Sequence, residues 1–283
     1  MTQEAFVSAP VDDDSAPDIA TQGLSLAYGN VSVIEGLELR LPAGQVTAIV
    51  GPNGCGKSTL LSGLSRLLKP CAGAVLLDGA DIQRVPSRQL AKRLALLPQH
   101  PHAPEALTVA ELVRFGRHPH QSWLCQWSSD DKACVDEALA MTGLTTLAER
   151  PVDALSGGQR QRAWIALAIA QQTSTLLLDE PTSALDLGHQ VEVYELIRSL
   201  TAAGKTIVMV IHDLVGACRY ADHLIAMHQG QILAEGPPGE TVTADLVRRL
   251  YGVDCTLMTD PATGAPLLTN VRRTRDALDG SAT

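Results

Sequence analysis

The sequence predicts an α/β fold with a mainly parallel sheet, and three observations support this prediction. Short apolar runs of strand length alternate with helical patterns along most of the 283 residues. Such alternation favours a parallel sheet, because each return to the same edge needs a crossover helix. One apolar run leads into a glycine-rich loop and a helix, and a helical stretch at about 102–154 interrupts the alternation. At roughly 150 residues per domain, the length allows two domains or one large domain with an insertion.

The first third of the chain begins with a tail and continues into strands. Residues 1–18 are polar, acidic and interrupted by proline, a composition typical of disorder. The segments 22–28 and 31–40 have strand patterns and are separated by a turn at Gly29-Asn30. Three further elements are predicted: a buried strand over 46–50, a helix from about 57 to 67, and a strand over 93–97.

The remaining two thirds contain the helical insertion and then return to α/β alternation. In the insertion, helices are expected over 108–115 and 130–142, on either side of a stretch rich in proline and tryptophan at 118–127. The later elements are predicted as a helix over 157–170, a strand over 175–179, a helix over 188–202, and strands over 206–211, 223–227 and 230–235. The end, 271–283, is expected to be frayed.

Charge and composition exclude several classes of protein. The formal net charge is −9 and the sequence pI is about 5.3, which argues against a nucleic-acid partner because such binders carry a basic surface. No apolar stretch reaches the ~18–20 residues that a membrane-spanning helix needs. The six cysteines show no metal-ligand spacing and no disulfide-scaffold density, so we expect free thiols.

A phosphate-binding loop is predicted at 51–59, where GPNGCGKST matches the pattern G-x-x-x-x-G-K-[ST] between a strand and a helix. Glycines let backbone N–H groups point at phosphate oxygens, and the helix N-terminus adds its positive dipole. Lys57 is expected to reach the β- and γ-phosphates, and Ser58 to offer its hydroxyl to Mg²⁺. The predicted contacts are Gly51, Pro52, Asn53, Gly54, Cys55, Gly56, Lys57, Ser58 and Thr59.

Two carboxylates follow the apolar run TLLLDE at 175–180. Asp179, at the carboxyl end of a parallel strand, is placed to hold the Mg²⁺ shell. Glu180 is placed to orient or deprotonate the attacking water. A solvated strand end is the alternative, and the phosphate loop in the same chain favours the functional interpretation.

The pentapeptide LSGGQ at 155–159 opens a strongly apolar helix. Ser156 is placed to cap this helix, and Gly157 and Gly158 leave backbone N–H groups free at its N-terminus, which makes a second anion site. The alternative is an ordinary helix start that contains glycine. A second site in a chain with one phosphate loop suggests that Ser156, Gly157, Gly158 and Gln159 serve the nucleotide of a neighbouring chain.

Together these motifs resemble the ATP-binding subunit of ABC transporters, over roughly 20–270. LSGGQ resembles the signature of that family. The resemblance implies a P-loop NTPase (RecA-like) core with a mainly parallel sheet, an N-terminal antiparallel β subdomain and an α-helical insertion. It places one nucleotide-binding domain at 19–270, with a helical subdomain at about 100–155.

The resemblance also gives roles to positions outside these motifs. Tyr28 is positioned like the aromatic residue that stacks on adenine, the alternative being an ordinary strand tyrosine. Gln99, in LLPQ, resembles the glutamine that senses Mg²⁺ and links to the membrane partner. His212 resembles the switch histidine near the γ-phosphate, and SALD at 183–186 resembles the loop that crosses the dimer interface.

The implied mechanism is a head-to-tail homodimer that encloses two ATP molecules. Each ATP would lie between Lys57 of one copy and the signature of the other, with Mg²⁺ held by residues such as Ser58, Gln99 and Asp179. The catalytic residues would be Lys57, Gln99, Glu180 and His212. Closure on ATP would drive two transmembrane permease subunits. An extracytoplasmic binding protein would deliver the substrate to these subunits. This places the chain at the cytoplasmic face of a bacterial membrane, as a peripheral protein.

Longer segments resemble the ATPases of iron–siderophore importers. These segments are FGRHPH at 115–120, RAWIALAIAQ at 162–171, SALDLGHQ at 183–190 and HDLVGACRYADHLIAMHQG at 212–230. Cobalamin, haem or an exported substrate are the alternative cargoes. One departure is Val215-Gly216, where that group usually has polar residues. We expect Gly216 to weaken the following helix by ~1 kcal/mol relative to alanine.

Other interpretations remain open at this stage. Trp123 and Trp127 either anchor a small core of the insertion, or residues 100–120 form a docking groove for the membrane partner. A non-transport ABC ATPase would usually carry a coiled-coil insertion, two nucleotide domains or a basic surface. A phosphate-loop kinase is disfavoured by LSGGQ and SALD.

Overall fold

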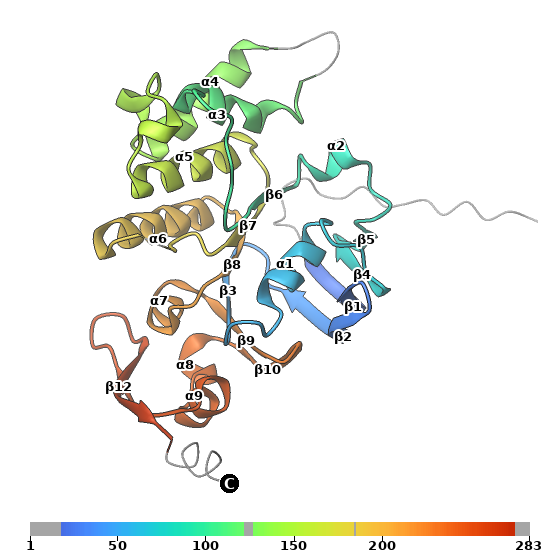
Figure 1. The fold of residues 1–283 in the computed structure, drawn as a ribbon, viewed down its shortest axis with the longest axis vertical. Helices are drawn as coiled ribbons and strands as arrows, with labels where there is room; N and C mark the ends of the chain where they lie inside the picture. Colours follow the sequence, from blue (N-terminus) through green and yellow to red (C-terminus); the bar gives the residue numbers. More distant parts are fainter. Residues whose placement is uncertain (1–17, 122–126, 184, 275–283) are drawn as a thin grey trace, which may run out of the picture.

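A six-stranded sheet forms the centre of the protein in a computed structural model, which describes residues 18–121, 127–183 and 185–274 (Figure 1). Its strand order is β10-β9-β3-β8-β7-β6, and β10 alone pairs antiparallel with its neighbour among these strands. The strands are β3 (Val46–Val50), β6 (Leu94–Leu97), β7 (Thr175–Asp179), β8 (Thr206–Val210), β9 (His223–His228) and β10 (Gln231–Gly236). Every residue of β3, β7 and β8 is buried, as expected for parallel strands covered on both faces. The predicted α/β class is confirmed.

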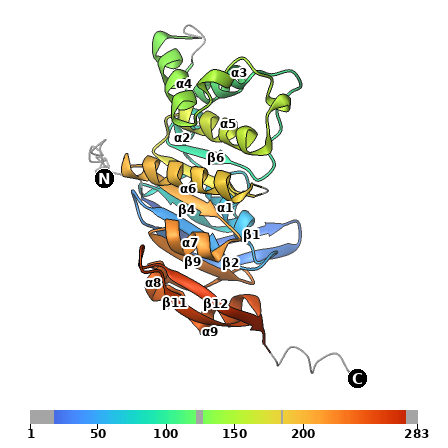
Figure 2. The same cartoon turned by 90° about the vertical axis from the view of Figure 1, so that its left-hand side faces the viewer.

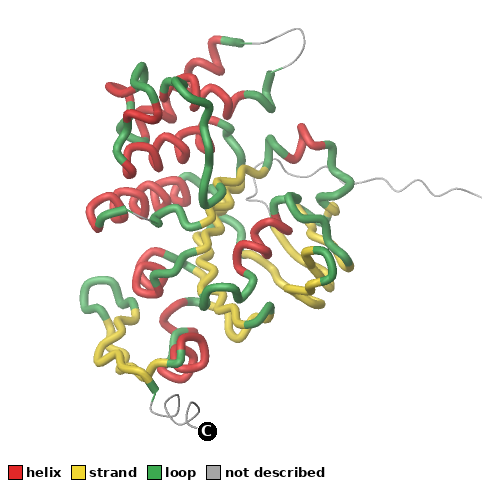
Figure 3. Tube along the Cα trace, viewed as in Figure 1, coloured by secondary structure: helices red, strands yellow, loops and turns green. Residues whose placement is uncertain are grey.

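An antiparallel sheet of order β2-β1-β4-β5 packs beside the central sheet. Its strands are β1 (Ile19–Tyr28), β2 (Val31–Leu41), β4 (Ala72–Leu77) and β5 (Ala80–Asp81). Helix α1 (Lys57–Leu64) lies between the two sheets, and its leucines share one apolar cluster with β1 and with β3 (Figure 3). Gly63 allows the close contact, because a Cβ there would lie 2.6 Å from the Leu26 side chain. This sandwich holds the start of α1 firmly against the sheet.

Helix α1 is shorter than the sequence predicted. It ends at Leu64, and Arg66 takes a left-handed conformation with φ of 64°. The Arg66 guanidinium then donates to the carbonyl oxygens of Ile82 and Val85, at 2.9 and 2.6 Å. A long-range contact therefore ends the helix one turn before the expected position near residue 67.

A group of helices lies at one end of the molecule (Figure 2). It contains the predicted insertion, and the helix at 157–170, which the sequence placed in the later α/β part, packs with it. The group contains α3 (Val109–Arg114), η1 (Phe115–Arg117), α4 (Ser129–Met141), η2 (Thr145–Leu147), η3 (Val152–Ala154) and α5 (Gly157–Ala170). Three of these helices begin with a capping box, formed by Thr108 with Glu111, Ser128 with Asp131, and Ser156 with Gln159. Such reciprocal hydrogen bonds satisfy backbone donors at a helix start.

A buried ion pair ties this helical group together. Arg117 Nε donates to Asp131 Oδ1 at 2.8 Å, and both residues are only 5% exposed. The same guanidinium donates to the carbonyl oxygen of Ala170, at the end of α5, at 2.8 Å. The arginine therefore joins η1, α4 and α5 at one point.

Helices from the second half of the chain cover the face of the central sheet that lies opposite α1 (Figure 1). The last elements of the chain lie at the end of the molecule away from the helical group (Figures 1 and 2). The elements of this half are α6 (Leu187–Ala202), α7 (Leu214–Tyr220), α8 (Pro238–Thr241), α9 (Ala244–Tyr251), β11 (Val253–Thr259) and β12 (Pro266–Arg273), and the short α2 (Ser87–Leu90) precedes β6. Strand β12 ends three residues beyond the boundary that the sequence suggested at 270, because it pairs with β11. In the described ranges, no helix has the length and apolar character needed to cross a membrane.

Gly216, the departure noted in the sequence, lies at a close contact in α7. A Cβ there would lie 2.8 Å from the hydroxyl of Tyr194 and 2.6 Å from Asp213 Oδ2. The Tyr194 ring itself stacks on Tyr220, with ring centroids 4.5 Å apart. The glycine therefore gives α6 room to approach α7, although it lowers the helix propensity of α7.

Candidate functional site

The phosphate loop connects β3 to α1 at the carboxyl end of the central sheet. Gly51 is required by space, because a Cβ there would lie 2.1 Å from the carbonyl oxygen of Met227. Gly56 caps α1 with a φ of 105°, which favours glycine. Lys57 is buried, and its Nζ donates to the carbonyl oxygens of Gly51 and Pro52 at 2.8 and 3.0 Å. The ammonium group is therefore already held over the loop.

Cys55 is the one phosphate-loop side chain whose surroundings are clearly apolar. It is buried among the residues under α1, and burial raises the pKa of its thiol. Its Sγ would lie 2.9 Å from a Cβ on Gly51. The Cys55 side chain therefore packs inward, so only its backbone is placed to meet a phosphate.

The end of β7 provides an oxygen pair next to the loop. Ser58 Oγ donates to Asp179 Oδ1 at 3.2 Å. Burial raises the pKa of Asp179, and the hydrogen bond from Ser58 opposes that shift. A hydroxyl and a carboxylate oxygen side by side are the hard ligands that Mg²⁺ prefers. Among the described residues, no group of three histidine, cysteine or acidic side chains could hold a metal ion.

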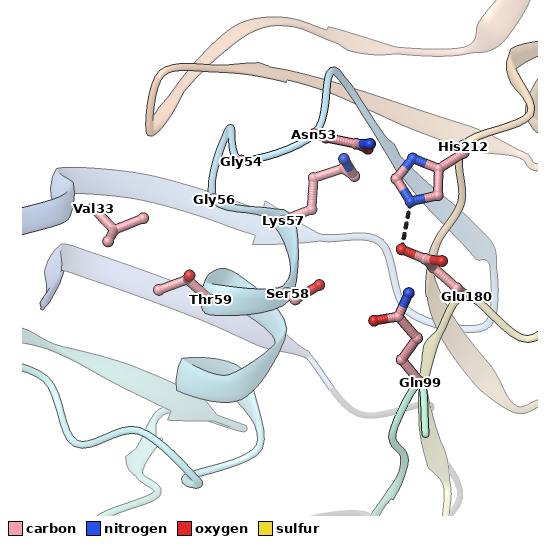
Figure 4. A pocket seen from close by; sticks show the side chains of 10 residues that line it. All are labelled: Val33, Asn53, Gly54, Gly56, Lys57, Ser58, Thr59, Gln99, Glu180 and His212. Carbon is pink, nitrogen blue, oxygen red and sulfur yellow. Dashed lines mark hydrogen bonds and ion pairs between the residues drawn. The ribbon is translucent and has the colours of Figure 1, made fainter. Parts of the chain in front are cut away.

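Glu180 and His212 face each other across the same space. Glu180 has a φ of 51°, which is rare for a residue other than glycine and is typical of functional sites. Its Oε1 accepts a hydrogen bond from Nε2 of His212, a residue in the loop after β8 (Figure 4). Parallel strand order explains the encounter, because β7 and β8 are neighbours and end at the same edge.

Lys57, Ser58, Glu180 and His212 line one cavity of about 410 Å³. Its lining residues are Val33, Asn53, Gly54, Gly56, Lys57, Ser58, Thr59, Gln99, Glu180 and His212 (Figure 4). The structure thus brings together predicted residues from four separate parts of the chain. Val33, from β2, was missed by the sequence reasoning, because only the packing of the antiparallel sheet against the loop places it there.

Several predicted contacts are not among the residues that line this cavity, namely Tyr28, Gly51, Pro52, Cys55, Asp179 and the signature residues Ser156, Gly157, Gly158 and Gln159. Tyr28 ends β1, is 54% exposed and is not among the lining residues. The signature begins α5, where Ser156 Oγ accepts from Gln159 N at 3.3 Å and Gln159 Oε1 accepts from Ser156 N at 3.2 Å. The sequence placed Ser156 as a cap, and the Ser-x-x-Gln spacing carried the signal for the second half of this capping box.

Two other features of the sequence can be placed. Trp127 is 37% exposed, and the Arg114 guanidinium lies 4.3 Å from the centre of its ring. It is therefore a surface residue, and its interpretation as a core anchor is wrong. Trp123 and Ala184 lie outside the described residues. Asp186, the last residue of SALD, caps α6 by accepting from His189 N at 3.0 Å.

Comparison with known proteins identifies the family. The family described as "ABC transporter" matches residues 34–183. The chain belongs to the ABC transporter family. This ABC ATPase is 52% identical over 250 residues to "Achromobactin transport ATP-binding protein CbrD" of Dickeya dadantii (strain 3937), covering 88% of this chain and 93% of that protein. It is 49% identical over 262 residues to "Ferric enterobactin transport ATP-binding protein FepC" of Escherichia coli (strain K12), covering 92% and 97%.

Solved structures show the same fold. This ABC ATPase matches the dimeric post-hydrolysis state of the ATP-binding cassette MJ0796, bound to ADP and Pi, with a TM-score of 0.69 and 28% identity, covering 77% of this chain and 98% of that one. It also matches the ADP conformation of the cassette MJ1267, with a TM-score of 0.72 and 26% identity, covering 88% and 97%.

Proposed function

We propose that this ABC ATPase binds Mg²⁺-ATP in the cavity over its phosphate loop and powers import of an iron–siderophore complex. The observation that carries the enzymatic part is the convergence of Lys57, Glu180 and His212 on one cavity at the sheet edge. The cargo is supported by the relatives named for achromobactin and ferric enterobactin transport.

The nucleotide phosphates fit the loop and the start of α1. Backbone N–H groups of 53–58 and the buried Lys57 ammonium would neutralise the β- and γ-phosphates. Ser58, Asp179 and, across the cavity, Gln99 would hold Mg²⁺, which supplies further positive charge to the phosphate oxygens. Outside the cavity, Tyr28 would stack on the adenine ring.

Glu180 is placed to receive the proton of the attacking water. Its side chain is mostly buried at the cavity wall, and its contact with His212 fixes one carboxylate oxygen. The other oxygen is then left to orient water in line with the γ-phosphate. His212 would therefore sense the γ-phosphate and position the base at the same time.

The signature supports a shared site between two copies. Ser156, Gly157, Gly158 and Gln159 stand apart from the cavity of their own chain, and the MJ0796 cassette is described as dimeric. In a head-to-tail homodimer, the N–H groups at the start of α5 would face the γ-phosphate bound to the other copy. Residues 183–186 would cross the interface.

A mixing experiment tests the shared site. Gly157→Asp is suitable, because a Cβ at Gly157 meets nothing within 4 Å and an acidic side chain favours a helix N-terminus, yet its charge would repel a facing phosphate. Lys57→Ala and Gly157→Asp should each be inactive alone. Their mixture should regain ATPase activity, because heterodimers then contain one intact site. An inactive mixture, with heterodimers shown by differential tags, would contradict the shared site.

The same relatives support a transporter as the partner. Two transmembrane permease subunits would receive the closing motion at the cytoplasmic face of a bacterial membrane, and an extracytoplasmic binding protein would deliver the cargo. We propose that residues 100–120 form the docking surface, where the Phe115 ring is largely exposed. Cysteine crosslinking from Phe115 to the permease tests this. Crosslinks only from a distant site such as Met258 in β11 would contradict it.

Growth of a deletion strain on defined iron sources tests the cargo. Loss of growth on one siderophore, restored by the wild-type gene and not by Lys57→Ala, is the expected result. A cobalamin importer is the second candidate, because "Cobalamin import ATP-binding protein BtuD" of Halobacterium salinarum is 38% identical over 262 residues. Loss of cobalamin-dependent growth with normal iron uptake would favour that candidate.

A further inference from the structure

His189 lies against the second glycine of the signature. A Cβ built on Gly158 would be 2.6 Å from His189 Cδ2 and 2.8 Å from Cγ, so the imidazole ring packs on the glycine itself. The same construction on Gly157 meets nothing within 4 Å. Gly158 does not have a positive φ, so its backbone conformation does not require glycine. The space that the His189 ring occupies requires it.

The ring of His189 is held in place by the interface loop. Asp186 Oδ1 lies 2.7 Å from His189 Nδ1, and the same oxygen accepts from the His189 backbone N–H at 3.0 Å. These hydrogen bonds lower the pKa of Asp186, which favours the charged carboxylate as an acceptor for the ring. In this orientation of the ring, Nε2 lies on the side of Gly158, 3.1 Å from the added Cβ.

A second contact joins the same two helices one turn further on. Arg162 of α5 lies 3.5 Å from Glu192 of α6, and the Glu192 side chain is half exposed. This pair ties α5 to α6 without touching the signature glycines. Weakening this pair therefore loosens α5 from α6 in general, whereas a change at His189 affects the specific contact with Gly158.

We propose that His189 is a positioning residue for ATP hydrolysis, which fixes the signature turn to Asp186 of the interface loop. The inference rests on the proposed shared site, in which the signature faces the nucleotide of the other copy. Through the His189 ring, the backbone N–H groups at Gly158 and the Asp186 carboxylate keep one relative position when two copies close. His189 acts on the signature and does not touch the reacting atoms of its own cavity.

A double-mutant cycle tests this inference on the full-length homodimer. Gly158→Ala forces the ring out of its place, and His189→Ala removes it, so both changes break the same contact. The two losses in kcat should therefore overlap, and the double variant should be no less active than Gly158→Ala alone. Losses that multiply in the double variant would overturn the inference. Melting temperatures show whether each variant is folded.

Two further variants keep the test decisive if Gly158→Ala does not fold. His189→Ala should lower kcat about tenfold and leave the KM for ATP nearly unchanged, because the phosphate loop is intact. His189→Asn can still donate to Asp186 but lacks the part of the ring that reaches Gly158, so it should not restore kcat. Wild-type kcat in His189→Ala, or full rescue by asparagine, would overturn the inference.

Glu192→Gln is the matched control. It weakens the Arg162 contact between the same helices and should leave kcat within about twofold of the wild type. A loss equal to that of His189→Ala would show a general loosening of α5 and α6, and would overturn the specific role. The mixing experiment with Lys57→Ala and Gly157→Asp distinguishes the two failures. If the mixture is active while the cycle is additive, only the role of His189 fails.

Discussion

The two halves of the proposed ATP site are built in opposite ways. The phosphate-loop half collects residues from β2, the β3–α1 loop and the ends of β6, β7 and β8 into one cavity. The signature half is a single helix start, whose side chains hydrogen-bond to each other within four residues. The first half depends on the whole sheet, and the second depends on local capping and on the helices that support α5. Substitutions in the first half should therefore remove groups that act on the bound nucleotide, and substitutions in the second should lower activity through helix stability or dimer closure.

Lys57→Ala should have the largest effect on turnover. It removes the cation over the loop, and with it the two hydrogen bonds to Gly51 and Pro52. We expect a loss of ATPase activity of about 100-fold or more, the range seen when one preorganised donor is removed. Phosphate release measures it, with the exposed Lys69→Ala as control. Near wild-type turnover in Lys57→Ala would disprove the phosphate-loop assignment.

Glu180→Gln should have the next largest effect and separate binding from hydrolysis. The amide keeps the size of the side chain and cannot accept the water proton, so hydrolysis should fall about 100-fold while ATP binding remains. The variant should accumulate as an ATP-bound dimer in gel filtration. The control is Glu240→Gln, at an exposed position of α8. If Glu180→Gln hydrolyses ATP at the wild-type rate, another group orients the water.

Asp131→Asn should destabilise the helical half and leave the cavity chemistry intact. It leaves the buried Arg117 guanidinium without its carboxylate, and breaking a buried pair costs about 3–5 kcal/mol of unfolding free energy. Urea denaturation measures this. Asp136→Asn on the same helix breaks the exposed pair with Lys132, at 2.6 Å, and should cost less than about 1 kcal/mol. Equal losses would show that burial of the first pair is unimportant.

The same pair predicts a dependence on pH. Burial by itself would raise the pKa of Asp131, but hydrogen bonds from Arg117 and Ser128 outweigh it and lower the pKa. Because the pKa is lower in the folded state, the stabilisation is present above the unfolded value of about 3.9 and is lost as pH falls through the folded pKa. The Asp131→Asn variant should lack this part of the acid sensitivity in denaturation curves between about pH 5 and 2.

Tyr28→Ala should have the smallest effect. An exposed ring that stacks on adenine contributes about 0.5–1.5 kcal/mol, so the KM for ATP should rise about two- to tenfold with kcat unchanged. Tyr28→Phe, which keeps the ring, should retain most of the affinity. An unchanged KM for ATP in Tyr28→Ala would show that Tyr28 does not stack on adenine and is an ordinary strand residue.

The sequence predicted the parts that depend on local pattern and on strand order. The phosphate loop, the acids after β7 and the histidine after β8 follow apolar runs, and parallel pairing brings such ends together. Val33 gave no local signal, because its place depends on how two sheets pack around α1. The contact of His189 with Gly158 was equally invisible, since it joins helix starts 31 positions apart.

Some missed elements did carry a signal. Helix α9 is capped at its start by Thr243, which accepts from Leu246 N, and at its end by Gly252 in a left-handed conformation. Both are ordinary helix boundary residues. By contrast, β11 and β12 are only partly buried and alternate irregularly. They pair with each other at the end of the molecule and bury few residues, so their sequences lack the regular apolar alternation that predicts a strand.

The capping box at Ser156 gives two residues of the signature a structural role besides the proposed binding role. The same serine and glutamine that would meet a neighbour's nucleotide also satisfy each other's backbone N–H groups at the start of α5. Removing such a cap costs about 1 kcal/mol of helix stability. When the nucleotide binds, either these side chains continue to cap the helix or the phosphate oxygens replace them as acceptors for its backbone N–H groups. ATP at this position would then serve as a helix cap, and its hydrolysis would leave the start of α5 free to change partners.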